Sequence, residues 1–400
     1  MKVLGIESSC DETAAAVVED GFRLLSNVVS SQMKDFEAYG GVIPEIAARL
    51  HIEIMPSVLE QALKEADCTW DDIDAIAVTY APGLIGSLLV GTLTARTIAY
   101  TKNIPLFPVH HVEGHVYANF LTEQRMQDGS AALKLPSQQP KFPMLALIVS
   151  GGHSQLVLFH DHGVYELLGQ AQDDAVGEAF DKVAKVIGLP YPGGVSISKL
   201  APEGDAHAFE FPKARLKCPE GCTHQPNRPV TQTDIDAGTV MKGGRGEYFL
   251  KERCHKYDFS FSGLKTAVLR AVQGQVGVDH TFPSHDLPER VSDTLRANVA
   301  ASFQRTVVET LVEKTLSAFH DYSPASVVIA GGVAANQELR RQLQEALPIP
   351  IEYAPMSLCT DNAAMIASLG YFHTLKNAPT NPFDLEVLPS ISMTKTAWGV

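Results

Sequence analysis

A strand–turn–strand unit occurs twice in this sequence. Residues 2–7 and 13–19 are apolar runs separated by a small, polar turn at residues 8–12. The pattern recurs at residues 144–149 and 155–159, where the turn reads Ser-Gly-Gly-His-Ser. Short apolar runs bounded by turn residues are typical of buried strands. Two such units, about 140 residues apart, indicate two lobes built on one plan.

Strands and helices alternate along the rest of the chain, which predicts an α/β fold. The segment 122–142 is polar and contains prolines, so we expect a linker or surface insertion there. The segment 203–255 is rich in Gly, Pro, Lys and Cys, and we expect a long irregular insertion. Further strands are expected at 73–79, 104–109, 326–330 and 349–353. The principal helices are expected at 42–66 with an interruption near Pro56, at 171–188, at 287–320 as one helix or a pair, and at 361–375.

The composition limits the classes of function. Asp and Glu number 46 against 32 Lys and Arg, which gives a formal net charge of −14. This balance argues against a general, charge-driven nucleic-acid binder, although it is compatible with a local basic groove or a basic partner. Six scattered cysteines are too few for a disulfide scaffold and favour a reducing compartment. No signal-like or membrane-length apolar segment is visible, so we expect a cytoplasmic protein without membrane contact.

His111 and His115 form the first candidate site. Four residues apart, they share a face if the segment is helical, and two imidazoles at that spacing can bind one metal ion. Glu113 stands two residues after the first histidine, which is not the zincin order His-Glu-x-x-His. Spacing alone is equally compatible with a metal pair and with a polar helix start that carries incidental histidines.

Two glycine turns form the second candidate site. Ser150–Gly152 and Gly331–Gly332 each follow an expected strand, and the latter precedes an expected helix. Backbone amides in such turns can approach a phosphate closely, and a helix N-terminus favours negative charge. Neither turn matches the P-loop or the dinucleotide fingerprint, and an ordinary turn is the alternative for each.

Carboxylates and cysteines supply the remaining candidates. Asp174, Glu178 and Asp181 share one face of a helix, as a ribose or metal contact or as a solvated face. Asp361 stands at a helix start, where aspartate is usually an N-cap, although it could complete a two-histidine metal site. The long insertion carries three cysteines and two histidines, whose spacings fit loop decoration better than a zinc site. They are Cys218, Cys222, His224, Cys254 and His255.

Eight segments resemble the universal tRNA threonylcarbamoyltransferase family in its bacterial TsaD type, formerly called O-sialoglycoprotein endopeptidases. They follow the family's order over almost the whole chain, and the resemblance fades at 122–142, at 203–255 and in the C-terminal tail. The segments are GIESSCDET (5–13), PGLIGSLLVG (82–91), HHVEGH (110–115), VSGGHSQLV (149–157), GEAFDKVAKVIGLPYPGG (177–194), FSFSGLKTA (259–267), AGGVAANQELR (330–340) and TDNAAMIA (360–367).

The resemblance implies a two-lobed α/β fold like that of actin, the heat-shock ATPases and the sugar kinases, with duplicated α/β lobes and a nucleotide cleft between them. It implies an N-terminal lobe of residues 1–122 plus 362–400 and a C-terminal lobe of residues 143–361, interrupted by the irregular insertion at 203–255.

The family's functional residues can be carried over to matching positions. By similarity, one divalent metal ion, Fe2+ in the first place and Zn2+ in the second, is bound by His111, His115 and Asp361. Two imidazoles and one carboxylate suit either metal and leave positions open for substrate. Asp11 is expected to orient the attacking amine or to accept its proton. By similarity again, the nucleotide-like substrate is bound by Ile148, Val149, Ser150, Gly151, Gly152, Asp181, Gly194 and Asn336.

The implied reaction transfers threonylcarbamoyl from threonylcarbamoyl-AMP to N6 of adenosine 37 in tRNAs that read ANN codons, with release of AMP. The implied partners are tRNA, an inactive paralogue subunit (TsaB type) and a small ATPase (TsaE type), while a separate synthase makes the adenylate. Because the chain carries a net charge of −14, we expect it to bind tRNA weakly by itself.

Three other functions compete with this one. A metallopeptidase would need a general base on the histidine helix, and Glu113 is misplaced for the His-Glu-x-x-His arrangement. A small-molecule kinase or ATPase of the same fold would use the glycine turns and Asp11 but has no need of His111 and His115. A non-enzymatic scaffold would not need the combined set of metal and nucleotide residues.

Overall fold

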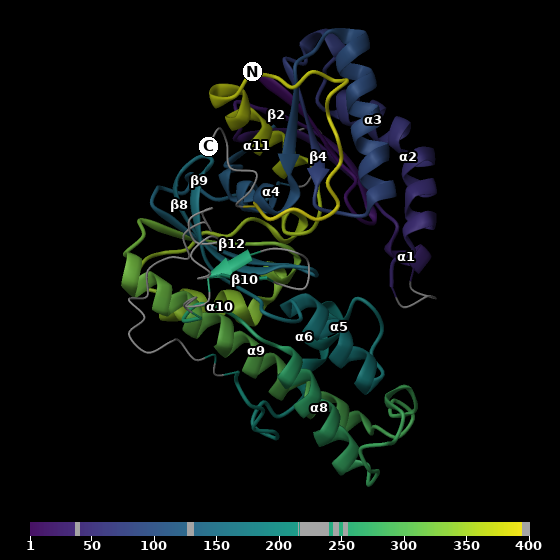
Figure 1. The fold of residues 1–400 in the computed structure, drawn as a ribbon, viewed down its shortest axis with the longest axis vertical. Coiled ribbons are helices and arrows are strands. Elements are labelled where there is room, and N and C mark those ends of the chain that lie inside the picture. Colours follow the sequence, from purple (N-terminus) through teal and green to yellow (C-terminus); the bar gives the residue numbers. More distant parts are fainter. Residues whose placement is uncertain are drawn as a thin grey trace.

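The computed structural model describes residues 1–36, 41–125, 132–214, 216, 240–242, 248–250 and 255–393. The chain forms two lobes, each with its own mixed β-sheet, and the first lobe lies in the upper part of the view in Figure 1.

The two sheets repeat one plan. In each, three successive strands form an antiparallel meander, and a later strand pairs in parallel with the first strand of that meander. The order of the first sheet is β5-β4-β1-β2-β3-β6, and that of the second is β12-β7-β8-β9. The predicted two-lobed α/β fold of the actin, heat-shock ATPase and sugar-kinase kind is thereby confirmed. The strands are β1 (Lys2–Glu7), β2 (Glu12–Glu19), β3 (Arg23–Ser31), β4 (Ala75–Ala81), β5 (Leu106–His110), β6 (Glu123–Gln124), β7 (Met144–Val149), β8 (Ser154–Asp161), β9 (Val164–Gln170) and β12 (Ser326–Ala330).

Helices cover both faces of the first sheet. Side chains alternate across a strand, so on β1 Leu4 and Ile6 pack in one core with α2 (Pro44–Glu65) and α3 (Ile85–Lys102). Val3 packs in a second core with α11 (Ala363–Lys376). Gly5 permits a close approach on that side, since a Cβ there would lie 2.3 Å from the carbonyl oxygen of Ala363. The start of α11 is therefore held against the middle of β1.

The remaining helices are α4 (His111–Tyr117), which contacts both sheets, a short helix of the first lobe, and the helices of the second lobe. Helix α4 is buried along its whole length and contacts α11, β7 and β12. Within the described ranges, no helix combines the length and the apolar character needed to cross a membrane. The others are α1 (Met33–Phe36) in the first lobe and α5 (Val176–Ile187), α6 (Gly193–Leu200), α8 (Ser262–Gln275), α9 (Asp293–Tyr322) and α10 (Gln337–Ala346) in the second.

Three local expectations need correction. Residues 349–353 pair with no strand in the described part of the chain, because Pro348 and Pro350 cannot donate to a ladder. The helix α2 is not interrupted at Pro56, because the carbonyl left without its partner belongs to Ile52, which is 62% exposed and open to water. The insertion at 203–255 contains a small antiparallel sheet of β10 (Val240–Lys242) and β11 (Tyr248–Leu250).

Residues 377–393 return from the end of α11 across both lobes. The backbone amide of Leu388 donates to the carbonyl of Tyr80, in β4, at 3.0 Å. The Tyr165 hydroxyl of the second lobe donates to the carbonyl of Met393 at 2.8 Å, and the Met393 side chain is buried. This segment thus contacts the sheets of both lobes.

Candidate functional site

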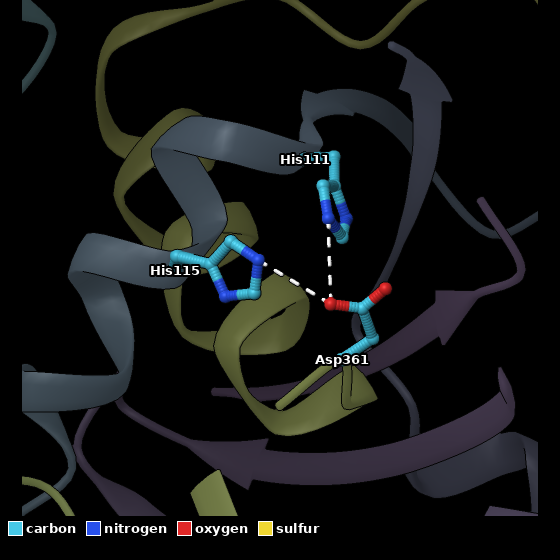
Figure 2. A group of neighbouring side chains, drawn as sticks. All are labelled: His111, His115 and Asp361. Carbon is cyan, nitrogen blue, oxygen red and sulfur yellow. Dashed lines mark ion pairs between the residues drawn. The ribbon is translucent and has the colours of Figure 1, made fainter. Parts of the chain in front are cut away.

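The two histidines and Asp361 meet beneath the first sheet. His111 opens α4 directly after β5, and His115 follows one helical turn later. Their Nε2 atoms lie 3.5 Å and 3.3 Å from Asp361 Oδ1, and Figure 2 shows both rings pointing towards that carboxylate. The three ligand atoms lie within 4.8 Å of one another. The Asp361 side chain is 22% exposed against 1% for His115, so the group opens on the aspartate side.

Asp361 does not cap the helix that follows it. The N-cap of α11 is Asn362, whose side-chain oxygen accepts from the backbone N–H of Met365 at 3.1 Å. Reading Asp361 alone as a cap was therefore wrong. Because Asn362 caps the N-terminus of α11, the carboxylate of Asp361 is free to face the two histidines.

Glu7, at the end of β1, holds His111 from behind. His111 Nδ1 lies 3.1 Å from Glu7 Oε2, and Glu7 is completely buried. The same carboxylate accepts from the backbone N–H of Ser9 at 2.6 Å and from the Thr79 hydroxyl. An ionised carboxylate only accepts, so His111 Nδ1 carries a hydrogen that points to Glu7, and Nε2, which faces Asp361, is the nitrogen that can bind a metal once the ring is neutral. A carboxylate behind a histidine is the usual second layer of a metal site.

Opposed charges dominate the electrostatics of this group. Burial opposes a charge on His111, but the carboxylates of Asp361 and Glu7 outweigh it and raise the pKa of His111 to about 9. Burial likewise opposes ionisation of Asp361, but His111 and His115 hold the pKa of Asp361 well below its ordinary value. Burial would also raise the pKa of Glu7, but His111 lowers it overall. Two carboxylates thus stabilise positive charge at this point.

The donor set fits a divalent cation. His115 is buried, and among the described residues its Nε2 faces only the carboxylate of Asp361, at 3.3 Å. A cation between the two would be bound by both the imidazole and the carboxylate. Two imidazoles and one carboxylate match iron or zinc. Glu113 lies outside this group, with its carboxylate 3.4 Å from the Tyr165 oxygen, so it does not stand where the general base of a metallopeptidase would be needed.

The two glycine turns lie side by side in the second lobe. The strands β7 and β12 are parallel, with Ile148 beside Ala330, so the turns that follow them share one edge of the sheet. Gly331 has a φ of +89°, and a Cβ there would lie 2.5 Å from the carbonyl oxygen of Val149. By contrast, a Cβ at Gly151, Gly152 or Gly332 would meet nothing within 4 Å. Packing does not require these three glycines, and their backbone is open to a ligand.

The other predicted nucleotide residues differ in how far the fold already uses them. Ile148 and Val149 are buried in β7, so only their backbone can face a ligand. Asp181 accepts from the backbone N–H of Gly193 at 2.7 Å, and burial raises its pKa. A Cβ at Gly194 would lie no closer than 3.9 Å to another atom, which leaves the backbone accessible there.

Asn336 is fully engaged by its neighbours. Its oxygen caps α10 by accepting from Leu339 N–H at 3.0 Å. Its amide donates to Ser198 Oγ and to Gln304 Oε1, at 2.9 Å each. Asn336 therefore ties α10 to α6 and α9 next to the Gly331–Gly332 turn.

The acidic face divides into two parts. α5 begins at Val176, so Asp174 precedes the helix. Lys182 pairs with Asp174 at 2.7 Å and with Glu178 at 2.6 Å. Asp181 instead turns to Gly193, so the three carboxylates do not form one site.

Asp11 lies near Tyr191 of the second lobe and near Glu12 and Asp361. Burial raises the pKa of Tyr191, and the nearby charges of Asp11 and Asp181 raise it further. Burial together with the charges of Asp361 and Asp11 also raises the pKa of Glu12. One tyrosine hydroxyl of the second lobe thus lies close enough to Asp11 and Asp181 for both charges to raise its pKa.

Sequence reasoning missed Glu7, His153 and Tyr191. His153 lies at the end of the turn after β7. Burial lowers its pKa, and the charges of His111 and His115 lower it further, to about 4. It is therefore a neutral imidazole close to His111, His115 and Asp361. All three residues lie inside the resembling segments, and a buried carboxylate at a strand end was the available signal for Glu7. Of the cysteine–histidine group only His255 lies within the described residues, where it pairs with Asp258 at 2.7 Å; Cys218, Cys222, His224 and Cys254 lie outside them.

Comparison with known proteins decides the family. The TsaD family model, tRNA N6-adenosine threonylcarbamoyltransferase, matches residues 23–368. A curated protein of that name from Thermomicrobium roseum is 44% identical over 408 residues, covering 98% of this chain and 98% of its own. The chain belongs to this family. Another threonylcarbamoyltransferase of the family, from Desulfitobacterium hafniense, is 44% identical over 396 residues with the same coverage of both chains.

A solved structure shows a more distant likeness. Component A of the (R)-2-hydroxyglutaryl-CoA dehydratase of Acidaminococcus fermentans has a TM-score of 0.43 and 12% identity, covering 94% of this chain and 100% of its own. The part of this chain that the TsaD family model matches, residues 23–368, includes His111, His115 and Asp361. Glu7 and Asp11 precede the matched part.

Proposed function

We propose that the chain transfers threonylcarbamoyl from threonylcarbamoyl-AMP to N6 of adenosine 37 in tRNAs that read ANN codons, releasing AMP. Membership of the family, whose relatives are named tRNA N6-adenosine threonylcarbamoyltransferases, supports the reaction class. The observation that carries the proposal is the group of His111, His115 and Asp361 with His153, the end of an open glycine turn, close enough to feel its charges. One side can hold a cation, and the other can hold a nucleotide.

The open glycine turns would bind the adenylate. Gly151, Gly152 and Gly332 leave space above their backbone, and a phosphate can approach amides in such turns closely. Asp181 lies on α5, whose first turn packs at Gly177 against Ser150 and Gly151, and its carboxylate suits ribose hydroxyls. The leaving group would thus be held against the second lobe while the carbamoyl carbon faces the first.

His111, His115 and Asp361 would hold one divalent cation, Fe2+ in the first place and Zn2+ in the second. When bound, such an ion supplies a Lewis acid for a phosphate or carbonyl oxygen. The buried carboxylate of Glu7 keeps His111 in the tautomer that offers Nε2, and the exposed edge of Asp361 leaves that side open to substrate.

Asp11 would serve the attacking amine. The N6 lone pair is delocalised into the adenine ring, so the amine needs orientation and loses a proton as the new N–C bond forms. The C–O bond to the phosphate breaks in the same transfer, and AMP carries away the electron pair. Asp11 lies on the first-lobe turn and interacts with Tyr191 of the second lobe, which supports a place between the two reactants.

An exposed apolar stripe on α3 supports the proposal that this chain binds a partner protein. Ile85, Leu89 and Leu93 recur every four residues on α3 and are 58%, 41% and 52% exposed. α2 lies beside α3 on the outer flank of the first lobe (Figure 1). Ile52 of α2 is also exposed. Such patches mark interaction surfaces and suit a paralogue subunit of the TsaB type. A small ATPase of the TsaE type is proposed on the family resemblance, and the net charge of −14 supports the need for help in holding tRNA.

A reconstituted transfer assay tests the proposal. It combines the chain, the partner proteins, the synthase, threonine, bicarbonate, ATP and an ANN-decoding tRNA, and it measures threonylcarbamoyladenosine at position 37. We expect product with the wild type and with His285→Ala, a control whose side chain is 76% exposed, but not with His111→Ala. No product from the wild type would contradict the transferase and favour the kinase or scaffold alternatives. Product from His111→Ala would remove the metal group from the reaction, and near-normal product from Asp11→Ala would remove Asp11.

A further inference from the structure

A buried histidine lies behind the turn that carries Asp11. His51 comes from α2, is 0% exposed, and takes no part in the metal or nucleotide site described above. Its Nε2 lies 3.0 Å from the carbonyl oxygen of Cys10. Its Nδ1 lies 2.7 Å from the Thr13 hydroxyl, so the ring spans the turn from its start to the first residues of β2.

The partners assign the tautomer of His51. A carbonyl only accepts, so Nε2 carries the hydrogen and donates it to Cys10. Nδ1 is then an acceptor, and the Thr13 hydroxyl donates to it. Burial lowers the pKa of His51, which favours the neutral ring with one donor and one acceptor. Both nitrogens are therefore used, each in the role that its partner requires.

The orientation of the Cys10 carbonyl determines the orientation of the peptide group that joins Cys10 to Asp11. A peptide group is planar, so the orientation of the Cys10 carbonyl also sets that of the Asp11 amide. The Ser87 hydroxyl of α3 donates to the same carbonyl at 3.1 Å, and the backbone N–H of Leu84 donates to the Ser9 carbonyl at 2.8 Å. Residues of α2 and of the start of α3 thus hold the turn in place by hydrogen bonds to its carbonyls.

The close packing of α3 confirms how tightly this turn is enclosed. A Cβ at Gly83 would lie 2.5 Å from the carbonyl oxygen of Ser9, and a Cβ at Gly91 would lie 2.3 Å from Ser8 Oγ. The turn therefore has little freedom to move backwards. Its rotation is held by hydrogen bonds: His51 and Ser87 donate to the Cys10 carbonyl, and the backbone N–H of Gln32 donates to the Asp11 carbonyl at 3.0 Å.

We propose that His51 is a positioning residue for the transfer reaction, which aims the Asp11 carboxylate by holding the Cys10–Asp11 peptide through Nε2–H. The inference rests on the proposed role of Asp11. It assigns no contact between His51 and substrate, and it predicts an effect on the rate of transfer rather than on binding.

Two polar replacements of His51 distinguish the hydrogen bond of Nε2 from that of Nδ1. In His51→Gln the amide can reach the position of Nε2 and donate to Cys10, whereas in His51→Asn it reaches only the position of Nδ1 and the Thr13 hydroxyl. A small misplacement of a reacting group can cost about 100-fold in rate. We therefore expect His51→Asn to lower kcat about 10- to 100-fold with KM for threonylcarbamoyl-AMP nearly unchanged, and His51→Gln to recover most of that loss.

The controls distinguish positioning from simple loss of stability. Met55→Leu changes another buried residue of α2 without touching the turn, and we expect wild-type kcat. Melting temperatures of both His51 variants are measured beside it. Equal kcat for the Asn and Gln variants, or a KM effect as large as the kcat effect, would overturn the proposal.

A double-mutant cycle keeps this inference separate from the function on which it rests. In the Asp11→Ala background, His51→Asn should cause little further loss, because the group that it positions is already absent. An equal loss in both backgrounds would show that His51 acts elsewhere and would overturn the proposal. A near-normal rate for Asp11→Ala itself would contradict the role of Asp11 first, and the inference about His51 would fall with it.

Discussion

Replacing Glu7 by Gln tests how the metal group is built. Three donors converge on the Glu7 carboxylate, namely the Ser9 N–H, the Thr79 hydroxyl and His111 Nδ1–H. The glutamine amide has one oxygen and one NH2 group in place of the two carboxylate oxygens. Either the Ser9 N–H or the His111 Nδ1–H must therefore face the NH2 group, which cannot accept it. If His111 faces the NH2 group, its hydrogen moves from Nδ1 to Nε2, and Nε2 loses the lone pair that binds metal.

The magnitude follows from that one lost bond. A hydrogen bond to a charged group contributes about 1.5–3 kcal/mol. A tenfold change in Kd corresponds to about 1.4 kcal/mol, so we expect Glu7→Gln to weaken metal binding about 10- to 100-fold. Losses of about this size are usual when the group behind a metal-binding histidine is changed.

The assay titrates metal-free protein with Co2+ and follows the visible absorption of the bound ion. Loss of the Glu7 charge also lowers the pKa of His111, which is about 9 with Glu7 in place, and so reduces competition from the proton. The loss of affinity should therefore be larger near pH 9 than at pH 7. Glu19→Gln, which removes a charge from the end of β2, should bind Co2+ like the wild type. An affinity of Glu7→Gln near pH 9 within about twofold of the wild type would refute the reasoning.

Three further predictions follow from the geometry. His111 has its pKa raised to about 9 and must be neutral to bind metal, so the affinity for Co2+ should rise about tenfold per pH unit from pH 6 to 8 with release of one proton, and a flat profile would contradict this. Gly91→Ala would place a Cβ 2.3 Å from Ser8 Oγ and should lower the free energy of unfolding by about 1–3 kcal/mol, whereas Gly274→Ala, with no atom within 4 Å, should be neutral or stabilising in the same denaturant titration. Gly152→Ala also meets no atom within 4 Å, so we expect an unchanged melting temperature but a raised KM for threonylcarbamoyl-AMP; an unchanged KM would place the adenylate elsewhere.

Local patterns predicted the parts of the fold that are buried on both faces. β1 and β7 are apolar runs whose every position after the first residue of β1 is buried, so they could be recognised from residue type alone. β3 and β9 escaped recognition because they are only partly buried and carry polar residues such as Ser26, Asn27 and Glu166. The segment 349–353 was misread for the opposite reason, since apolar residues between prolines resemble a strand that cannot form a ladder.

The same limit applies to the site. The spacing of His111 and His115 is a local property, and the helix that it required is present. Local rules favoured a cap for Asp361 and left a metal ligand as the alternative, which the family resemblance preferred; the cap is in fact Asn362. Asp181 appeared to share a face with Asp174 and Glu178, but α5 begins too late and Asp181 turns to Gly193.

By itself, the sequence determined that two lobes share one plan, that two histidines lie on one face of a helix, and that two glycine turns follow buried strands. These properties depend on side-chain periodicity and on backbone freedom, which neighbouring residues set. Only the tertiary structure brought Asp361 to the histidines, Glu7 behind His111, and His51 behind the turn of Asp11. The physical reason is that these contacts join distant segments through the close packing of α11 and α3 on the first sheet, where glycines let the backbones meet.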